Sequence, residues 1–348
     1  MKKKVLVGMS GGVDSSVAAA LLLKQGYDVT GITFRLWHEA TESASRDAAR
    51  VAEVLGIRHK TVDFSETFRS QVLDYFVHEY QNGRTPNPCI ACNRTIKFGK
   101  FLDLANELDA DYIATGHYAR IIKEKNGFYR LGISAAKRKD QSYFLYHLTQ
   151  EQLARTLMPL DGIEKQETRS IAEKLALPVA SKPDSQDICF IPDGDYLRFL
   201  KEYAQLKDKK GFFRSISGEI LGEHNGIAHF TVGQRKGLGV TFGKPMFVTG
   251  LDAKTNTVYL GEKGSEFTKE FTAADMHLSV PNTLNEPLRL HCKVRYAAPA
   301  AACTLTKIDN SRVRVTMDEP ARAVTPGQAA VFYEDDKIFG GAIIEDMY

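Results

Sequence analysis

Short apolar runs alternate with helix-patterned segments along the first 120 residues, and this alternation constrains the fold more than any other feature. Strands separated in this way are joined by helical crossovers and pair in parallel. The expected strands lie at residues 5–8, 28–34, 58–63 and 112–116, and the expected helices at residues 15–25, 45–55 and 98–108. The sequence therefore predicts an α/β domain that binds its ligand at the carboxyl ends of the strands.

The run SGGVDSS, residues 10–16, separates the first strand from the first helix. Its glycines let the backbone approach an anion, and Ser10, Ser15 and Ser16 add hydroxyl donors where the helix exposes its first N–H groups. A Walker-type loop carries a lysine where this chain has Asp14. The run therefore predicts a site where Mg²⁺ bridges Asp14 to the β and γ phosphates, which leave together. The alternative is a glycine turn that only starts a helix.

Composition limits the class of protein. The chain has 348 residues, 43% of them hydrophobic, and a formal charge of +3, which predicts neither a disordered chain nor a large basic field. No apolar run approaches the roughly 18 residues of a membrane span. Five cysteines, an odd number without a signal segment, favour reduced thiols over a disulfide scaffold. We therefore expect a cytoplasmic protein without a membrane partner.

The chain changes character near residue 205. Helix patterns at residues 170–177 and 195–204 are followed by short β-type runs between turns, which predicts mostly antiparallel strands. Residues 266–271 are expected to separate a small middle segment from a last stretch that is long enough for a barrel. The expected strands lie at residues 229–232, 246–249, 257–260, 288–295, 302–307, 312–317, 329–333 and 338–344. The expected domains are an α/β nucleotide-binding domain at 1–205, a small β-rich domain at 206–268 and a C-terminal β-barrel at 269–348.

Three cysteines are candidates for chemistry. Cys89 and Cys92 form a Cys-x-x-Cys pair in an ordered, proline-rich loop. The spacing alone is compatible with four roles for this pair: structural zinc ligands, a redox pair, iron–sulfur cluster ligands, or a nucleophilic cysteine beside a second thiol. Cys189 follows a polar segment and is either a third reactive thiol or a buried one. Cys292 and Cys303 lie in strand patterns, and we interpret them as core cysteines.

A basic and aromatic run at residues 136–146 is a candidate RNA contact. Basic residues up to Lys139 precede Tyr143, Phe144 and Tyr146, a combination that suits phosphate contacts beside an unstacked base. The alternative is a solvated turn ahead of a buried aromatic segment. The run alone leaves both interpretations open.

The motifs, taken in order, resemble those of the tRNA-specific 2-thiouridylases, which use ATP to replace O2 of the wobble uridine by sulfur. The resemblance covers the whole chain. It rests on SGGVDSS at 10–16, TPNPxxxCN at 85–93, IKF at 96–98, ATGHYAR at 114–120, KDQSYFL at 139–145, ICFI at 188–191, FTVGQRKGLG at 230–239 and KVRY at 293–296. The implied fold is an α/β PP-loop domain followed by a β-rich domain and a tRNA-binding β-barrel.

The resemblance implies the site residues. The uridine oxygen would attack the α-phosphate of ATP, Cys189 would accept persulfide sulfur from a donor protein, and Cys92 would attack the base or resolve the persulfide, leaving a Cys92–Cys189 disulfide. Basic neighbours such as Arg94, Lys97 or His117 would lower the pKa of the attacking thiol. The ATP-binding residues would be Gly8, Met9, Ser10, Gly11, Gly12, Val13, Asp14, Ser15, Phe34 and Gly116, with Mg²⁺ at Asp14.

The chain departs from the commoner family pattern at Cys89, where many members have an aspartate. An alternative for the sulfur step follows, in which Cys89, Cys92 and Cys189 hold three irons of a [4Fe–4S] cluster. The RNA-binding residues that the resemblance implies are Asn87, Pro88, Cys89, His117, Lys139, Asp140, Gln141, Arg295, Tyr296 and Gln328, with Arg235 and Lys236 as further candidates.

Two other functions share parts of the pattern. Adenylate-forming amidases and ligases use the same loop but do not need Cys92 or Cys189. A nucleotide-sensing or RNA-binding module would bind tRNA without releasing pyrophosphate. Formation of 2-thiouridine separates the three.

Overall fold

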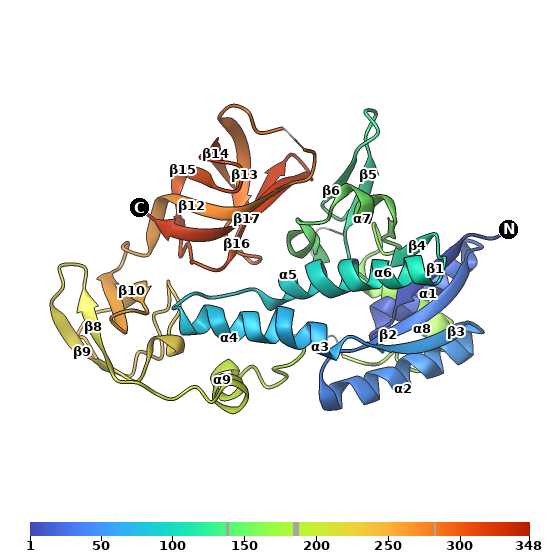
Figure 1. Ribbon diagram of the computed structural model, residues 1–348, viewed down its shortest axis with the longest axis horizontal. Helices are drawn as coiled ribbons and strands as arrows, with labels where there is room; N and C mark the ends of the chain where they lie inside the picture. The colour runs from blue at the N-terminus through green and yellow to red at the C-terminus, as the bar shows by residue number, and fades with distance from the viewer. Residues whose placement is uncertain (137–138, 184–187, 282) are drawn as a thin grey trace. The chain divides into compact units, whose positions relative to one another are not determined.

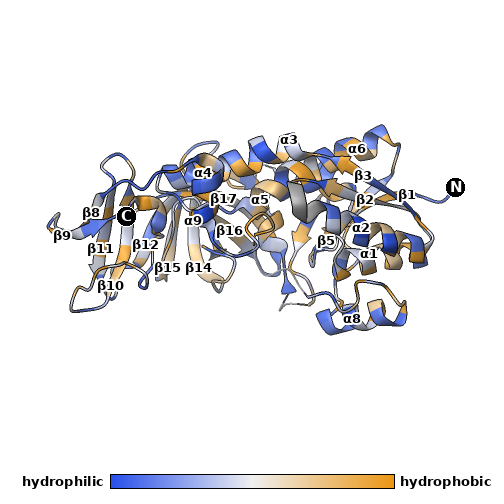
Figure 2. Ribbon diagram, turned by 90° about the horizontal axis from the view of Figure 1, so that it is seen from below, coloured by the Kyte–Doolittle hydropathy of each residue, from blue (hydrophilic) through white to orange (hydrophobic). Residues whose placement is uncertain are grey.

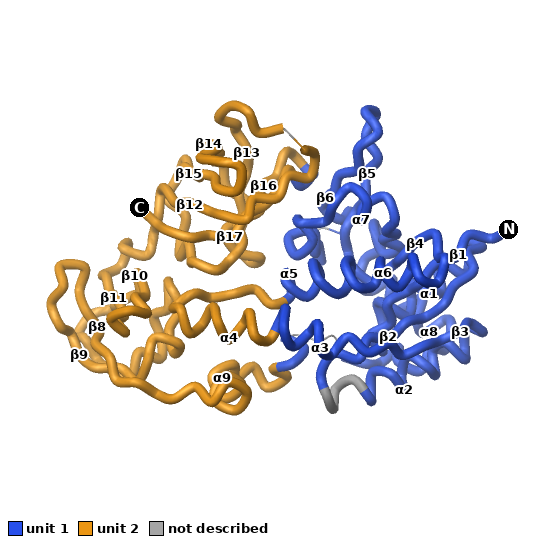
Figure 3. Tube along the Cα trace, viewed as in Figure 1, with its two compact units in different colours: residues 1–72, 89–190, 336–338 blue, residues 73–88, 191–335, 339–348 orange. Residues whose placement is uncertain are grey.

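The computed structural model describes residues 1–136, 139–183, 188–281 and 283–348. The chain forms two compact units, which Figure 3 shows in different colours. Unit 1 contains residues 1–72, 89–190 and 336–338, and unit 2 contains residues 73–88, 191–335 and 339–348.

A parallel sheet forms the centre of unit 1. Its strand order is β3-β2-β1-β4-β7, and every neighbouring pair runs parallel. Helices α1, α2 and α8 pack together on one face, and α6 lies on the other, as right-handed crossovers require (Figure 1). The strands are β1 (Lys4–Gly8), β2 (Asp28–Arg35), β3 (Arg58–Asp63), β4 (Tyr112–Ala114) and β7 (Thr156–Leu157), and the four helices are α1 (Val13–Lys24), α2 (His38–Leu55), α6 (Phe101–Glu107) and α8 (Lys165–Lys174).

These elements form because their apolar residues share the core of unit 1. The three central residues of β1 are buried, as expected for a strand covered on both faces. Apolar side chains of α1, including Val17 and Leu22, pack into the same cluster as those of β1 and α8. The predicted α/β class is therefore confirmed. Helix α2 begins at His38, seven residues earlier than the pattern predicts.

The remaining elements of unit 1 include a π-helix, η2 (Asn93–Lys100), which directly follows the short helix α5 (Pro88–Cys92). The hairpin of β5 and β6 pairs with the first residues of β17 through Gly132 and Lys337. The other bounds are α3 (Ser65–Phe68), π-helix η1 (Arg69–Leu73), β5 (Arg120–Lys123), β6 (Tyr129–Gly132), 3₁₀-helix η4 (Ser142–Leu145) and α7 (Gln150–Ala154).

Unit 2 contains a closed antiparallel barrel. The strands follow in the order β12-β15-β14-β13-β16-β17, and pairing of β12 with β17 closes the sheet. Inward residues of these strands form one apolar core, and polar and apolar residues alternate along strands in Figure 2. The bounds are β12 (Phe267–Leu278), β13 (Leu288–Lys293), β14 (Ala301–Lys307), β15 (Val313–Arg322), β16 (Ala329–Glu334) and β17 (Lys337–Met347).

A smaller sheet of unit 2 has the order β10-β11-β8-β9, in which only β11 and β8 pair in parallel among the described strands. The predicted β-rich segment and the C-terminal barrel are therefore confirmed as fold classes. The other bounds in unit 2 are α4 (Asp74–Gln81), α9 (Tyr196–Ala204), β8 (Gly211–Ser215), β9 (Ile220–His224), 3₁₀-helix η5 (Ile227–His229), β10 (Met246–Asp252) and β11 (Thr257–Glu262).

Two local predictions are wrong. Residues 229–232 do not form a strand, because η5 ends at His229 and the buried residues Phe230 and Val232 belong to a loop. Residues 266–271 do not form a separating segment, because Phe267 starts the long strand β12 of the barrel. Phe230 and Val232 are buried, and burial alone does not distinguish a strand from a packed loop.

No described helix of this structure is both long enough and apolar enough to span a membrane.

Candidate active site

The loop between β1 and α1 fits a bound anion. Gly11 has a φ of 67°, and a Cβ there would lie 2.5 Å from the backbone oxygen of Ala44, so only glycine fits. Gly12 is the N-cap of α1 and provides no side-chain cap. The N–H groups of the first turn of α1 have no carbonyl within the helix to bond, and they stay available to a phosphate. The loop therefore has the geometry of a phosphate-binding cradle.

The other predicted nucleotide residues lie beside this loop. A Cβ on Gly116, after β4, would lie only 2.7 Å from the backbone nitrogen of Ser15, so the end of β4 touches the start of α1. A Cβ on Gly8 would lie 3.3 Å from the ring of Phe34, which is only partly buried and lies 4.8 Å from the ring of Phe101. The structure brings the three segments to the carboxyl edge of the sheet. Their contact with a nucleotide stays a prediction.

Asp14 is held by residues that the local sequence does not indicate. Its Oδ1 accepts hydrogen bonds from Lys165 Nζ at 2.6 Å and from the Tyr118 hydroxyl at 2.8 Å. The Tyr118 oxygen also lies 3.1 Å from Thr168 Oγ1. Oδ2 of Asp14 has no hydrogen-bond partner among the described residues, so this oxygen is available to a cation such as Mg²⁺.

A second lysine reaches the loop from a distant part of the chain. Lys182 Nζ donates to the carbonyl oxygen of Gly11 at 3.0 Å and to Asp47 at 2.7 Å. Neither Lys165 nor Lys182 lies in a motif that predicts a phosphate contact. The adjoining residues 184–187 of the predicted polar loop lie outside the described residues.

The three candidate cysteines all belong to unit 1. Cys92 ends α5 and is 6% exposed, whereas Cys89 and Cys189 are accessible to solvent. All five cysteines of the chain are free thiols. The predicted core cysteines Cys292 and Cys303 are confirmed, because both are buried in the barrel.

The protein around the candidate cysteines disfavours the thiolate form of each one. Burial raises the pKa of Cys92 to about 12, and the Lys97 ammonium opposes this shift. Desolvation also raises the pKa values of Cys89 and Cys189, again opposed by Lys97.

We expected basic neighbours such as Arg94, Lys97 or His117 to lower the pKa of the attacking thiol. Of these three, only Lys97 acts in that direction on Cys92, and desolvation outweighs it. Burial, and then the charge of Lys97, lowers the pKa of His117 well below 6.5, so its ring is neutral. Its Nδ1 lies 2.8 Å from Thr115 Oγ1. Arg94, which is exposed, is not among the groups that shift the pKa of any of these thiols. A neutral imidazole adds no positive charge that would stabilise a thiolate.

The geometry does not support the cluster alternative. Among the described residues, no group of three or more histidine, cysteine, aspartate or glutamate side chains is placed to hold a metal ion. Cys89, Cys92 and Cys189 are all described residues, so this statement includes them. No step of the reaction is therefore assigned to a cluster.

The predicted RNA contacts in unit 1 form an ordered turn. Asp140 accepts hydrogen bonds from the Ser134 N–H at 2.9 Å and the Ser142 hydroxyl at 2.7 Å, and Gln141 Oε1 accepts from the Tyr118 N–H at 3.1 Å. Lys139 is exposed. Residues 137 and 138 of the basic run lie outside the described residues. The aromatic residues Tyr143 and Tyr146 are buried, as the solvated-turn interpretation expects.

The predicted RNA contacts in unit 2 have structural partners. Arg295 donates to the carbonyl oxygens of Val232 and Ala323 and to the Thr325 hydroxyl, all at 2.6–2.9 Å. Gln328 Nε2 donates to the Thr85 carbonyl oxygen at 2.8 Å.

Gln328 therefore anchors the segment that continues into Asn87 and Pro88. Of these two residues, Pro88 is buried and Asn87 is partly buried, whereas Tyr296 is 39% exposed. Arg235 and Lys236 are both exposed.

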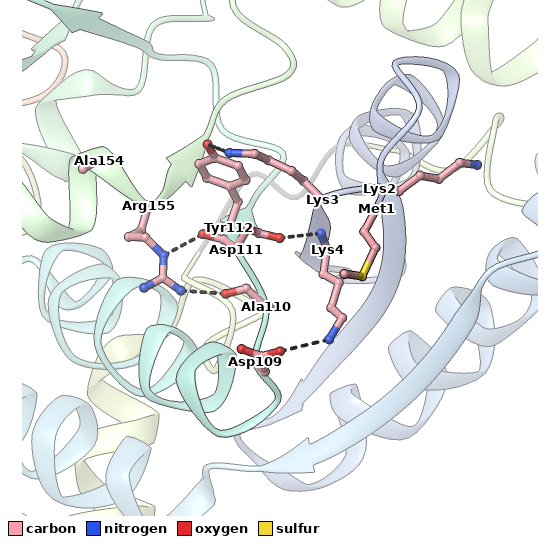
Figure 4. Close-up of a pocket in the computed structure, with 10 residues that line it drawn as sticks. All are labelled: Met1, Lys2, Lys3, Lys4, Asp109, Ala110, Asp111, Tyr112, Ala154 and Arg155. Atoms are coloured by element: carbon pink, nitrogen blue, oxygen red, sulfur yellow. Dashed lines mark hydrogen bonds and ion pairs between the residues drawn. The ribbon is translucent and has the colours of Figure 1, made fainter.

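A pocket of about 540 Å³ lies at the opposite edge of the same sheet, where β1 and β4 begin (Figure 4). Its charged side chains have partners within the pocket: Lys4 Nζ lies 3.2 Å from Asp109, and Arg155 donates to the backbone oxygens of Ala110 and Asp111. None of the predicted site residues lines this pocket. It is therefore separate from the candidate active site.

Comparison with protein families agrees with this organisation. Residues 3–193 match a family described as the tRNA methyl transferase HUP domain, residues 197–262 match the tRNA methyl transferase PRC-barrel domain, and residues 268–344 match the aminomethyltransferase beta-barrel domain. Among solved structures, an NMN synthetase from Francisella tularensis is similar over 60% of this chain and 79% of its own, with a TM-score of 0.37 and 17% identity.

Full-length relatives are much more similar. The chain is 48% identical over 356 residues to tRNA-specific 2-thiouridylase MnmA of Clostridioides difficile, with 99% of both chains covered. It is 49% identical over 357 residues to the protein of the same name from Acetivibrio thermocellus, again with 99% of both covered. The chain belongs to the family of tRNA-specific 2-thiouridylases.

Proposed function

We propose that this protein is an ATP-dependent tRNA sulfurtransferase that converts the wobble uridine to 2-thiouridine. The main support is that one compact unit contains both the phosphate-binding loop and the two cysteines, Cys92 and Cys189. The chain is also about half identical to a 2-thiouridylase over its full length. The loop serves activation of the uridine, and the cysteines serve sulfur delivery.

The loop supports activation by adenylation. Uridine O2 attacks the α-phosphate of ATP, the bond between the α- and β-phosphates breaks, and pyrophosphate leaves with the electron pair. The free N–H groups at the start of α1 stabilise the charge on the departing phosphates. Mg²⁺ at Oδ2 of Asp14 would supply further charge neutralisation. The adenylated base then has AMP as its leaving group.

Cys189 and Cys92 support the sulfur step. The terminal sulfur of a persulfide on Cys189 attacks C2 of the base, and AMP leaves with the C–O electron pair. The Cys92 thiolate then attacks Sγ of Cys189, which breaks the persulfide S–S bond and leaves the sulfur on C2 as a thiocarbonyl. A Cys92–Cys189 disulfide results, and an external thiol reduces it. Burial raises the pKa of Cys92 to about 12, so this attack requires that the Cys92 thiol first lose its proton.

The partners follow from this chemistry. A persulfide-bearing donor protein supplies the sulfur to Cys189, which is accessible to solvent. Of the predicted tRNA contacts, Lys139, Tyr296, Arg235 and Lys236 are exposed and therefore accessible to tRNA. We also propose the domain boundaries at residues 205 and 268 and a cytoplasmic location.

The test is thiolation of unmodified tRNA in the presence of ATP, Mg²⁺ and a persulfide donor. We expect Cys189→Ser to lose 2-thiouridine formation and to retain tRNA-dependent release of pyrophosphate, because the hydroxyl cannot carry persulfide sulfur. Cys89→Ser is the matched variant, and we expect it to retain both. Normal thiolation by Cys189→Ser would remove Cys189 from the mechanism. Loss of thiolation in Cys89→Ser, with iron and sulfide in the anaerobically purified protein, would restore the cluster alternative.

A further inference from the structure

The phosphate-binding loop has an unmet electrostatic requirement. It carries Asp14 where a Walker-type loop carries the lysine that reaches the outer phosphates. A departing pyrophosphate is strongly anionic, and the start of a helix contributes only roughly half of an elementary positive charge. A negative side chain in the loop makes this balance worse. Mg²⁺ held at Asp14 would offset part of this charge, and cationic side chains from other parts of unit 1 can offset more of it.

Lys165 neutralises the acidic position. It is the first residue of α8, and its Nζ lies 2.6 Å from Asp14 Oδ1. The Lys165 side chain is 14% exposed, and close packing in partial burial makes this ion pair stronger than a surface pair. The hydroxyl of Tyr118 donates to the same oxygen. With Asp14 compensated in this way, the loop itself no longer repels an anion.

Lys182 supplies charge beside the glycines. Its Nζ lies 3.0 Å from the Gly11 carbonyl oxygen, in the segment where the backbone can approach a phosphate. The same nitrogen lies 2.7 Å from Asp47 of α2. An ammonium group has three donors, so Lys182 can keep both of these partners and still donate to a phosphate oxygen. Its side chain is 39% exposed, so it is open to a ligand.

The fold holds Lys182 in this place through α8. Arg169 Nη1 donates to the carbonyl oxygens of Ala180 at 3.2 Å and Lys182 at 3.1 Å, which fixes the backbone on either side of residue 181. Helix α8 itself packs against α1, the helix that follows the loop. One helix therefore positions both lysines: Lys165 directly, and Lys182 through Arg169.

We propose that Lys182 binds the outer phosphates of ATP and the pyrophosphate product, in the role that a loop lysine has in Walker-type sites, while Lys165 neutralises Asp14. This inference rests on the proposed function for its ligand, and it names a binding residue that lies 171 positions from its hydrogen-bond partner Gly11.

The test measures binding of inorganic pyrophosphate and of AMP separately, by calorimetry at fixed Mg²⁺ concentration. We expect Lys182→Met to weaken pyrophosphate binding at least about tenfold, equivalent to about 1.4 kcal/mol, and to leave AMP binding unchanged because AMP lacks the outer phosphates. Lys182→Arg should recover most of the pyrophosphate affinity. The matched control is Lys174→Met, which removes an exposed lysine from the last turn of the same helix α8.

Two results would overturn the proposal. Unchanged pyrophosphate affinity in Lys182→Met would show that this lysine does not bind the outer phosphates. Equal loss of pyrophosphate and AMP binding would show that Lys182 only maintains the shape of the site. Thiolation of tRNA by the parent protein is measured separately. A parent that fails to thiolate while Lys182→Met selectively loses pyrophosphate would refute the proposed function and keep the assignment of Lys182.

Discussion

At the scale of single residues, the pKa values of the candidate cysteines depend on which basic side chains lie near their thiols. The sequence contains Arg94, Lys97 and His117 near the relevant motifs, and the structure leaves Lys97 as the cation that acts on all three thiols. Lys97 lies in the π-helix η2, five residues after Cys92. A π-helix advances about one turn in this interval, so the two residues lie near one face. An ordinary helical pattern would place them on different faces.

Cysteine alkylation tests this description. With iodoacetamide at pH 8, we expect Cys189 and Cys89 to react and Cys92 to stay largely unmodified, because burial raises the pKa of Cys92 to about 12 and leaves it 6% exposed. Only the thiolate reacts, so the rates at Cys89 and Cys189 should keep rising as the pH approaches and passes 9. Peptide mass spectrometry measures the extent at each cysteine, and unfolding in guanidinium should make all five react.

Substitution separates the effects of Lys97 and Arg94, two of the three basic residues of η2. Lys97→Met should slow alkylation of Cys189 roughly threefold to tenfold, because a nearby positive charge favours the thiolate. Arg94→Met removes a charge from the same helix and should leave the rate unchanged. Equal rates in parent and Lys97→Met, or fast labelling of Cys92 at pH 8, would contradict the description.

At the scale of elements, the active site depends on close contact between the end of β4 and the start of α1. The strand order of the sheet makes β1 and β4 neighbours, so the segments that follow them meet at the same edge. Gly116 lies where a side chain would collide with the backbone of Asp14 and Ser15. The glycine after β4 is therefore a packing requirement of the phosphate-binding loop.

Gly116→Ala is the corresponding test. A Cβ 2.7 Å from the backbone nitrogen of Ser15 must displace the first turn of α1, so we expect ATP affinity to fall more than about tenfold and stability to fall by about 1–3 kcal/mol. Gly250→Ala is the matched control, because its nearest neighbour would lie 3.7 Å away in ordinary contact. Calorimetry with ATP and thermal unfolding measure the two effects. Parental ATP affinity in Gly116→Ala would exclude the packing requirement.

At the scale of the whole molecule, unit 2 combines the small sheet, the barrel and residues 73–88. Within this unit, Arg295 joins the loop at Val232 to the segment at Ala323 and Thr325. Gln328 joins the barrel to Thr85. Residues that the family resemblance proposes as tRNA contacts therefore also hold separate parts of unit 2 together.

Arg295→Ala distinguishes these roles. We expect a loss of about 2–3 kcal/mol in unfolding free energy, because carbonyl oxygens at the partly buried site lose a charged donor. The salt dependence of tRNA binding should be unchanged. A phosphate contact would instead lower the slope of log affinity against log salt by about one, with little change in stability. Unfolding in urea and tRNA titrations at several salt concentrations measure the two outcomes.

Much of this architecture could be predicted from the sequence because it depends on local patterns. The alternation of β1, α1 and β2 follows from apolar periodicity, and the glycines and serines of residues 10–16 identify an anion site by their own chemistry. The strand predicted at residues 229–232 does not form, because a short apolar run is compatible with a buried loop as well as with a strand. The sequence contains no pattern that predicts the π-helix η2.

The sequence by itself determined the α/β class, the phosphate-binding loop and the three candidate cysteines. Only the tertiary structure decided which charged side chains lie beside the loop and the cysteines. Lys165 and Lys182 contact Asp14 and Gly11 of the loop, although they lie 151 and 171 positions away from them in the sequence. Burial lowers the pKa of His117 and raises that of Cys92, which favours the neutral form of both side chains. The physical reason is that periodicity and turn chemistry act between near neighbours in the chain. Ion pairing and desolvation depend instead on which distant side chains the packing of helices and strands brings together.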